Sequence, residues 1–330
     1  MMWSLGHEVF LYAGEFNSAP CTEHIAAFSE AERRLLCQDG IAGWTADHPA
    51  FRRFNEIASI ELSRRVQPQD MLCFIGGNAH MPIFNSVSVP TTPVEFGVGY
   101  AGVFAKHRVF ESYAWMHAIY GAADYVHAAR YYDAVIPNYY DTDLFHDRHG
   151  QGDERGEYLL FVGRIIERKG ILSAIETAKR TGIRLVVAGS GDVSLLSGHD
   201  CVEYVGSVGV EARSRLMGGA TALLCPTMYV GPFEGVHAEA QLCGTPVITT
   251  DWGVFTETVA QGVNGWRCRD LGEFSWAAKN AARLNRPAIR AAAQARFGMK
   301  HVRHRYEEYF ERLDTLWGEG WGSAQEREPR

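Results

Sequence analysis

The sequence predicts an α/β protein made of two doubly wound domains, each a parallel sheet covered by helices on both faces. Short apolar runs bounded by turn residues alternate with helical patterns along most of the chain, which is the pattern of parallel sheets. The length of 330 residues is too great for one ordinary core and suits two such domains. A polar, glycine-rich stretch at 146–156 interrupts the alternation, as a linker does.

The first half of the chain, residues 1–148, is predicted to be an amino-terminal Rossmann-like domain. A helical pattern runs from Phe54 to Val66. Strands are expected in four apolar runs: Val9–Tyr12, Met71–Ile75, Pro93–Phe96 and Ala134–Pro137. A doubly wound domain opens with a strand, a glycine-bearing turn and a helix, whereas residues 1–8 have the pattern of a helix end followed at once by a strand. We therefore expect that this domain lacks its opening strand and that the start is truncated.

Residues 149–300 have the pattern of a complete doubly wound domain. Helices are predicted at 170–181 and 237–243. Strands are predicted in five runs: Tyr158–Val162, Arg184–Ala188, Val202–Val205, Ala222–Pro226 and Pro246–Thr249. Further on, apolar residues recur at steps of three and four from Val302 to Leu316, which predicts an amphipathic helix. We expect this closing helix, within residues 301–321, to pack back on the first domain.

The composition, with 46% hydrophobic and 22% charged residues, excludes a disordered or fibrous chain. A formal net charge of −7 argues against a large nonspecific grip on nucleic acid, although a local patch stays possible. Seven scattered cysteines without a CxxC pair argue against a disulfide framework or a zinc site and favour a reducing compartment. No run approaches the roughly 18 apolar residues of a membrane span. A cytoplasmic protein is therefore expected.

A first group of chemically significant residues follows the strand predicted at 158–162. Gly163 ends that strand, Arg164 comes next, and Lys169 lies five residues later, just before a helix. The carboxyl end of a parallel strand is where an anionic ligand binds in a doubly wound domain. Two cations at this point would stabilise the charge of a diphosphate leaving group without a metal ion. The alternative is that both are solvated surface cations.

A second group lies at the start of the helix that carries Glu239. Gly235 turns the chain into this helix, and the peptide N–H groups of Gly235, Val236 and His237 would meet phosphates at its amino end. The carboxylate of Glu239 is placed to accept hydrogen bonds from two ribose hydroxyls. The alternative for Glu239 is a first-turn carboxylate that only complements the helix dipole.

Taken together, these residues resemble the carboxyl-terminal domain of the large family of retaining GT-B glycosyltransferases, glycosyltransferase family 4-like, that includes sucrose synthases and many bacterial polysaccharide glycosyltransferases. The family pattern is G-R-x4-K, then a G-x-G-D-like turn, then E-x7-E followed by A-x-x-x-G-x-P-V-I. Residues 158–266 carry this order, with the turn at Gly189–Asp192. A looser match at 133–141 is similar to the family's interdomain segment V-I-P-N-G-x-D, with Tyr139 in place of glycine. The resemblance implies two Rossmann-like domains that face a cleft.

The resemblance also implies the roles of individual residues. Arg164 and Lys169 would bind the diphosphate of a nucleotide sugar, and Glu239 its ribose. His237, close to the glutamate motif, would contact phosphate or sugar. The implied donor-binding residues are Gly163, Arg164, Lys169, Gly189, Gly235, Val236, His237 and Glu239.

One position departs from the family pattern. The first glutamate of E-x7-E meets the donor sugar near the reacting carbon in the family, but its position here is Gly231. Glu234 instead stands where the family usually has glycine. Either Glu234 reaches the site from three residues on, or donor selection differs, or activity is impaired.

The family often places a histidine after the fourth strand of the first domain, facing the donor sugar. His80 lies in the corresponding loop, several residues later than expected, and the alternative is a solvated loop histidine. The predicted catalytic residues are therefore Arg164, Lys169, Glu234 and His80.

The sequence thus predicts a retaining, metal-independent glycosyltransferase that needs no cofactor and uses a nucleotide diphosphate sugar as donor. The acceptor is open: a glycan, a lipid or a small molecule is favoured, and modified DNA is possible. A first alternative is a catalytically weak nucleotide-sugar-binding or partner protein of the same fold, because of Gly231 and the missing strand. A second alternative is a GT-B epimerase, which ranks last because its catalytic carboxylates and histidine are not evident.

Overall fold

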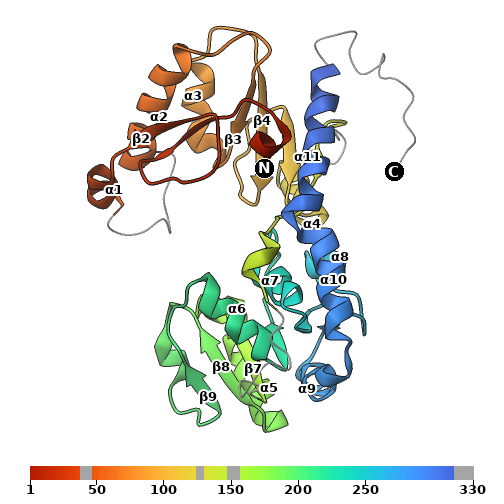
Figure 1. Ribbon diagram of the computed structural model, residues 1–330. Coiled ribbons are helices and arrows are strands. Elements are labelled where there is room, and N and C mark those ends of the chain that lie inside the picture. The colour runs from red at the N-terminus through yellow and green to blue at the C-terminus, as the bar shows by residue number, and fades with distance from the viewer. Residues whose placement is uncertain (38–46, 124–129, 147–156, 316–330) are drawn as a thin grey trace. The chain divides into compact units, whose positions relative to one another are not determined.

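The computed structural model describes residues 1–37, 47–123, 130–146 and 157–315 (Figure 1). The chain divides into two compact units. Unit 1 comprises residues 1–110, 123–136 and 303–330, and unit 2 comprises residues 111–122 and 137–302. The predicted domain boundary at 148 and 149 lies outside the described residues. The chain passes from one unit to the other four times. The crossing between Ile136 and Pro137 is the nearest to the predicted boundary.

Unit 1 contains two sheets, and all of their strands are parallel. The first sheet pairs β1 (Phe10–Gly14) with β2 (Glu23–Phe28). The second sheet has four strands in sequence order: β3 (Met71–Phe74), β4 (Thr92–Val98), β5 (His107–Phe110) and β6 (Ala134–Val135). The strands β2 and β5 were not among those predicted from the sequence.

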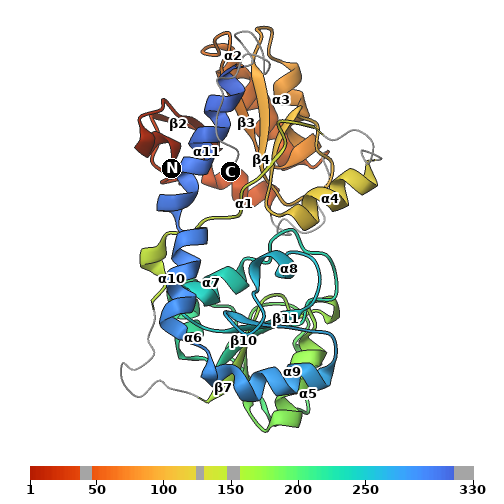
Figure 2. The same cartoon turned by 90° about the vertical axis from the view of Figure 1, so that its right-hand side faces the viewer.

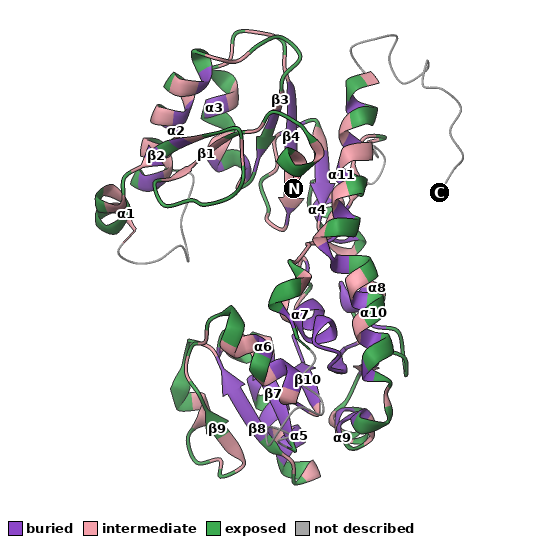
Figure 3. Ribbon diagram, viewed as in Figure 1, coloured by how far each residue is buried: buried purple, intermediate pink, exposed green. Residues whose placement is uncertain are grey.

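The order of these strands matches a doubly wound sheet whose opening strand is absent. A doubly wound sheet has the strand order 3-2-1-4-5-6, in which strand 1 is the opening strand and lies at the centre. In this protein β2 and β1 then correspond to strands 3 and 2 of that order, and β3 corresponds to strand 4. Among the described strands, β1 and β3 each have one paired neighbour. No residue of β1 is fully buried, whereas the first four residues of β4 are (Figure 3). Among the described strands none pairs with both β1 and β3, and the lack of an opening strand stays a prediction.

The helices of unit 1 cover these sheets. α2 (Pro49–Ser63) begins with proline after His48, whose ring nitrogen accepts a hydrogen bond from the Ala50 amide at 3.2 Å. α2 shares a core with β3 and with the short helices that follow β3. Other helices among the described residues of unit 1 are η1 (Met2–Leu5), α1 (Glu30–Leu36), η2 (Gly77–His80) and α3 (Met81–Asn85).

The last described helix, α11 (Met299–Asp314), belongs to unit 1 from Arg303 onwards. Its apolar stripe is buried, with Tyr306 and Tyr309 each 3% exposed and Leu313 fully covered. The hydroxyl of Tyr309 donates to the carbonyl of Tyr132 at 2.8 Å, so this helix is fixed to the segment that enters β6.

The described residues of unit 2 contain a six-stranded parallel sheet in the order β12-β11-β10-β7-β8-β9. Its strands β7, β10 and β11 are labelled in Figure 2. Its strands are β7 (Tyr158–Val162), β8 (Arg184–Ala188), β9 (Val202–Tyr204), β10 (Ala222–Cys225), β11 (Val247–Thr250) and β12 (Gly265–Cys268). The sequence predicted all of them except β12. The fold class predicted for this half, a doubly wound α/β domain, is confirmed.

Helices cover both faces of the sheet of unit 2, and each face has its own hydrophobic core. On one face, α5 (Ile171–Thr181) and α9 (Leu271–Asn280) pack together. The other core receives residues of α6 (Val210–Gly219), α7 (Val236–Leu242), α8 (Phe255–Thr258) and α10 (Arg286–Phe297). The inner strands are buried on both faces (Figure 3), and their apolar sequences follow from that.

The helix α4 (Tyr113–Ala122) of unit 2 comes from the first half of the chain. It starts at a carboxylate from α8, because Glu257 accepts hydrogen bonds from the amides of Tyr113 and Ala114 at 3.1 and 2.8 Å. A negative charge at a helix amino end is stabilising. This contact joins α4 to unit 2.

Candidate functional site

The strand order of unit 2 reverses between β7 and β10. From β7 the sheet continues through β8 and β9 in one direction, and through β10, β11 and β12 in the other. In open parallel sheets, ligands bind outside the carboxyl ends of the strands at such a reversal. The segments that leave β7 and β10 there, residues 163–170 and 226–239, contain both groups of residues predicted from the sequence. We take this edge as the candidate site.

Two glycine turns meet at this edge, one after β7 and one after β8. Gly189 has a φ of 150°, and a Cβ built on it would lie 2.8 Å from the carbonyl carbon of Gly163. The amide of Gly163 donates to the carbonyl of Ala188 at 3.0 Å. A side chain at Gly189 would collide with the backbone of Gly163, whereas at Gly163 it is the φ of 153° that favours glycine. Both predicted glycines thus leave bare backbone at the carboxyl edge of the sheet.

A third close approach joins the segment after β7 to the segment after β10. Gly170, which precedes α5, has a φ of 79°, and a Cβ built on it would lie 2.6 Å from the carbonyl carbon of Pro226. The amide of Met228 also donates to the carbonyl of Arg168 at 2.9 Å. The two predicted groups of residues therefore lie on segments that contact each other.

Lys169, at the end of η5 (Glu167–Lys169), forms an ion pair with Glu234. The two side chains are 18% and 5% exposed. The ring centre of Tyr229 lies 5.1 Å from the Lys169 ammonium. Burial lowers the pKa of Lys169, but the adjacent Glu234 carboxylate and the Tyr229 hydroxyl together more than offset this, and the net shift of the pKa is upward. Lys169 is therefore a fixed positive charge at neutral pH.

Arg164 differs from Lys169 in its exposure. Its side chain is exposed and has no hydrogen bond or ion pair with any other described residue. Its position directly after Gly163 places it at the carboxyl end of β7, beside the turn that contains Gly189. Of the two predicted cations, Lys169 is therefore held in an ion pair and Arg164 is exposed to solvent.

Glu239 lies in the first turn of α7 and is paired with an arginine from α6. Arg213 donates to both carboxylate oxygens, from Nε at 2.5 Å and from Nη2 at 2.9 Å. The Glu239 side chain is 11% exposed. Burial raises the pKa of Glu239, and Arg213 offsets part of that shift. Arg213 was not predicted from the sequence, because nothing in the pattern of α6 shows which of its arginines faces α7.

The amino end of α7 is only partly as predicted. Gly235 is its N-cap, and Val236 is its first residue. The hydroxyl of Tyr140 donates to the carbonyl of Gly235 at 3.3 Å. The amide of His237, expected to meet a phosphate, instead donates to the carbonyl of Glu234 at 3.1 Å. Of the three predicted amides, this leaves those of Gly235 and Val236 as candidates.

The His237 side chain lies in the core of unit 2, so the expectation that it contacts a ligand does not fit its position. It is fully buried, with its ring 5.3 Å from that of Phe233 and 5.6 Å from that of Phe255. Its Nδ1 lies 2.7 Å from the carbonyl of Glu234, to which it donates. Burial lowers the pKa of His237 to about 4. The imidazole is therefore neutral and helps to fix the backbone of Glu234.

His80 lies in unit 1, at the end of the short helix that follows β3. Its Nδ1 is 2.7 Å from the side-chain oxygen of Asn55, which is a buried residue of α2. The rings of Phe51 and Phe54 lie 5.3 and 5.1 Å from the imidazole. Burial lowers the pKa of His80. His80 is thus a positioned, partly buried histidine rather than a solvated one, and its catalytic role stays a prediction.

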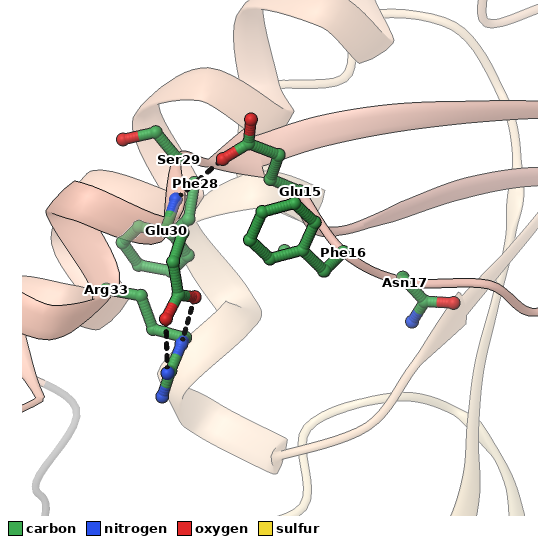
Figure 4. A pocket seen from close by; sticks show the side chains of 8 residues that line it. Glu15, Phe16, Asn17, Phe28, Ser29, Glu30 and Arg33 are labelled. Atoms are coloured by element: carbon green, nitrogen blue, oxygen red, sulfur yellow. Dashed lines mark hydrogen bonds and ion pairs between the residues drawn. The ribbon is translucent and has the colours of Figure 1, made fainter.

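Unit 1 has a small hollow of about 200 Å³ at the carboxyl ends of β1 and β2 (Figure 4). Glu15 and Phe16 line it on one side and Arg33 on the other. The charged groups there already have partners, since Glu30 is paired with Arg33 at 2.7 Å and its amide donates to Glu15 at 2.8 Å. None of the predicted site residues lines it.

In the described part of the chain, no group of three or more His, Cys, Asp or Glu side chains is arranged to hold a metal ion. None of its helices combines the length and the apolar character that crossing a membrane requires.

The part of the chain that contains the candidate site is similar to known proteins. Residues 156–283 match the family model Glycosyl transferases group 1. This segment, which includes the candidate site, is therefore similar to the glycosyltransferase domains that this family model describes. The D-inositol 3-phosphate glycosyltransferase of Mycolicibacterium paratuberculosis is 32% identical over 162 residues, which are 44% of this chain and 36% of that protein. The chain thus spans about a third of the length of the curated relatives that it matches.

Solved structures resemble nearly the whole chain. Sucrose-phosphate synthase from Thermosynechococcus elongatus matches with a TM-score of 0.72 and 17% identity, over 94% of this chain and 90% of that one. Anabaena Alr3699/HepE in complex with UDP-glucose matches with a TM-score of 0.63 and 17% identity, over 89% and 92% of the two chains. The predicted GT-B fold is confirmed by these likenesses.

Proposed function

We propose that this protein transfers a sugar from a nucleoside diphosphate sugar to an acceptor, with retention of the anomeric configuration and without a metal ion. The observation that carries the proposal is the ion-paired Lys169 at the reversal of the sheet, on a segment in contact with the one that leads to Glu239. Support comes from the glycosyltransferase match of this segment and from a similar structure whose complex contains UDP-glucose.

In the proposed reaction the diphosphate binds at the glycine turns. Arg164 and Lys169 would bind its oxygens and stabilise the negative charge that grows on it as the bond to the sugar breaks. The bare backbone of Gly163 and Gly189 allows a close approach of the ligand. The Glu239 carboxylate, held by Arg213, would accept hydrogen bonds from the ribose hydroxyls.

The acceptor is proposed by class only: a glycan, a lipid or a small molecule. All seven cysteines are free, which supports the proposal of a reducing, cytoplasmic location. His80 is proposed to act on the donor sugar, and a His80→Ala variant tests this role separately from binding of the nucleotide.

The experiment is a donor panel. Purified protein is incubated with UDP-, GDP- and ADP-sugars in EDTA, and both hydrolysis and transfer are measured. We expect turnover with one donor. Lys169→Met should lower kcat about 100-fold, the scale on which a single stabilising group acts on a transition state. Lys179→Met, an exposed lysine of α5, is the matched control and should leave kcat unchanged.

Two outcomes count against the proposal. Absence of turnover with every donor, combined with calorimetric binding of a sugar nucleotide, would favour a binding protein of the same fold. Turnover that depends on added Mn²⁺ or Mg²⁺ would overturn the metal-independent step.

A further inference from the structure

Glu234 has a backbone conformation that glutamate rarely adopts. Its φ is 62°, and among the described residues only Gln69 is another non-glycine with positive φ. This left-handed region is disfavoured for side chains other than those of glycine, asparagine and aspartate. Its neighbours hold it there, because the carbonyl of Glu234 accepts hydrogen bonds from the amide and from Nδ1 of His237, at 3.1 and 2.7 Å.

Gly231 presents the opposite case. It is buried, and its φ lies outside the left-handed region, so its backbone suits any residue. A side chain at position 231 would collide with the side chain of Glu234. A Cβ built on Gly231 would lie 2.8 Å from both Cγ and Cδ of Glu234, and closer still to Oε1. The carboxylate of Glu234 therefore occupies the volume into which a side chain at 231 would grow.

The residue at each of these two positions would thus suit the backbone of the other position better than its own. Position 231 holds glycine on an ordinary backbone, and position 234 holds glutamate on a backbone that favours glycine. The carboxylate in the shared volume is the partner of Lys169 and is 5% exposed. A glutamate at 231 would reach the same volume from the other side of the turn.

We propose that residues 231 and 234 form an exchanged pair, in which Glu234 supplies from position 234 a carboxylate that a glutamate at 231 would supply equally well. The feature on which the site depends is then the carboxylate beside Lys169, whichever of the two positions supplies it. This proposal rests on the proposed function for its consequence: the ammonium and the carboxylate together form a donor and an acceptor group for the hydroxyls and phosphate oxygens of a sugar nucleotide.

The test is a cycle of four proteins: the parent, Gly231→Glu, Glu234→Gly and the double variant. In the parent, Gly231→Glu puts two carboxylates into one volume and should lower Tm clearly. In the Glu234→Gly background the same substitution fills an empty space beside Lys169, and glycine takes the left-handed backbone at 234. There it should leave Tm unchanged or raise it.

Activity follows the same cycle. Glu234→Gly should lower kcat/KM by about 100-fold, and the double variant should recover to within about tenfold of the parent. Glu234→Gln keeps the size of the residue but leaves the Lys169 ammonium without its carboxylate, so it should lower both activity and Tm. A loss of activity in this variant shows that the charge matters.

Two results would overturn the exchange: an equal fall in Tm on Gly231→Glu in both backgrounds, or a double variant no more active than Glu234→Gly although it melts like the parent. If the parent shows no turnover with any donor, the proposed function fails. The Tm cycle then still decides whether the two positions are exchanged.

Discussion

Arg213 and Glu239 form a two-pronged pair in which both carboxylate oxygens accept hydrogen bonds from one guanidinium, at 2.5 and 2.9 Å. The pair joins α6 to α7, and the Glu239 side chain is 11% exposed. Planar pairs of this kind orient a carboxylate as well as stabilise it. Arg213 therefore sets the position from which Glu239 would meet a ribose.

We predict that Arg213→Gln raises KM for the sugar nucleotide about tenfold with a smaller effect on kcat, because a charge-assisted hydrogen bond to the binding carboxylate is lost. Burial already raises the pKa of Glu239, and Arg213 counters that rise. Without Arg213 the pKa rises further. KM of the variant should therefore increase as the pH falls below neutral, over a range in which KM of the parent is flat.

The measurement is KM against pH for the parent and the variant. Arg215→Gln is the matched control, since Arg215 lies on the same helix and its contact with Glu211 is long, at 3.8 Å. A variant whose KM is raised equally at every pH would mean that Arg213 contacts the ligand itself rather than tuning Glu239.

The sequence predicted most of unit 2 because its signals are local. Gly163 follows an apolar run that β7 buries, and Gly235 stands at the start of α7. The strand β5 was missed because its sequence begins with His107 and Arg108, which read as surface residues. Arg108 is in fact 1% exposed and paired with Asp133, a residue that only the tertiary structure brings near.

Two features of the candidate site could not be predicted from the sequence either, because they too depend on the folded structure. The Gly231 and Glu234 relationship depends on the backbone φ at 234, which residue identity alone does not give. His237 was expected at a ligand because of its place beside the glutamate motif. It is enclosed instead by aromatic rings, two of which, Phe255 and Phe297, come from α8 and α10.

The buried His237 should make the stability of the protein sensitive to mild acid. Its pKa is about 4 in the folded protein, against about 6.5 when unfolded. Between these values the unfolded state binds more protons. The stability present above about pH 6.5 is therefore lost as the pH falls toward 4, by about 3 kcal/mol in all.

We expect His237→Phe to remove this part of the pH dependence, because phenylalanine does not titrate and suits an aromatic core. Urea midpoints measured from pH 7.5 to about 4.5 check this. His301→Gln, at an exposed histidine of α11, should keep the slope of the parent. Equal slopes in the parent and the His237→Phe variant would show that other groups cause the acid sensitivity.

The Arg108–Asp133 pair should be essential to unit 1. Both side chains are 1% exposed, and Asp133 accepts from Nε at 3.2 Å and from Nη2 at 2.5 Å. Removing the charge of one partner of such a pair destabilises a protein by about 3–5 kcal/mol. We predict a loss of this size for Asp133→Asn. The exposed pair Arg184–Glu203 is the control: Glu203→Gln should change stability by less than about 1 kcal/mol. Comparable losses in the two variants would contradict the prediction.

The edges of β1 and β3 give a prediction about backbone protection. Each strand is paired on one side only among the described strands, whereas β7 lies between β10 and β8. Amide groups on an unpaired edge exchange with solvent through small local openings. We therefore expect peptides from β1 and β3 to exchange hydrogen for deuterium much faster than the peptide from β7, as followed by mass spectrometry. If β1 and β3 are already as protected as β7, another segment pairs with their edges.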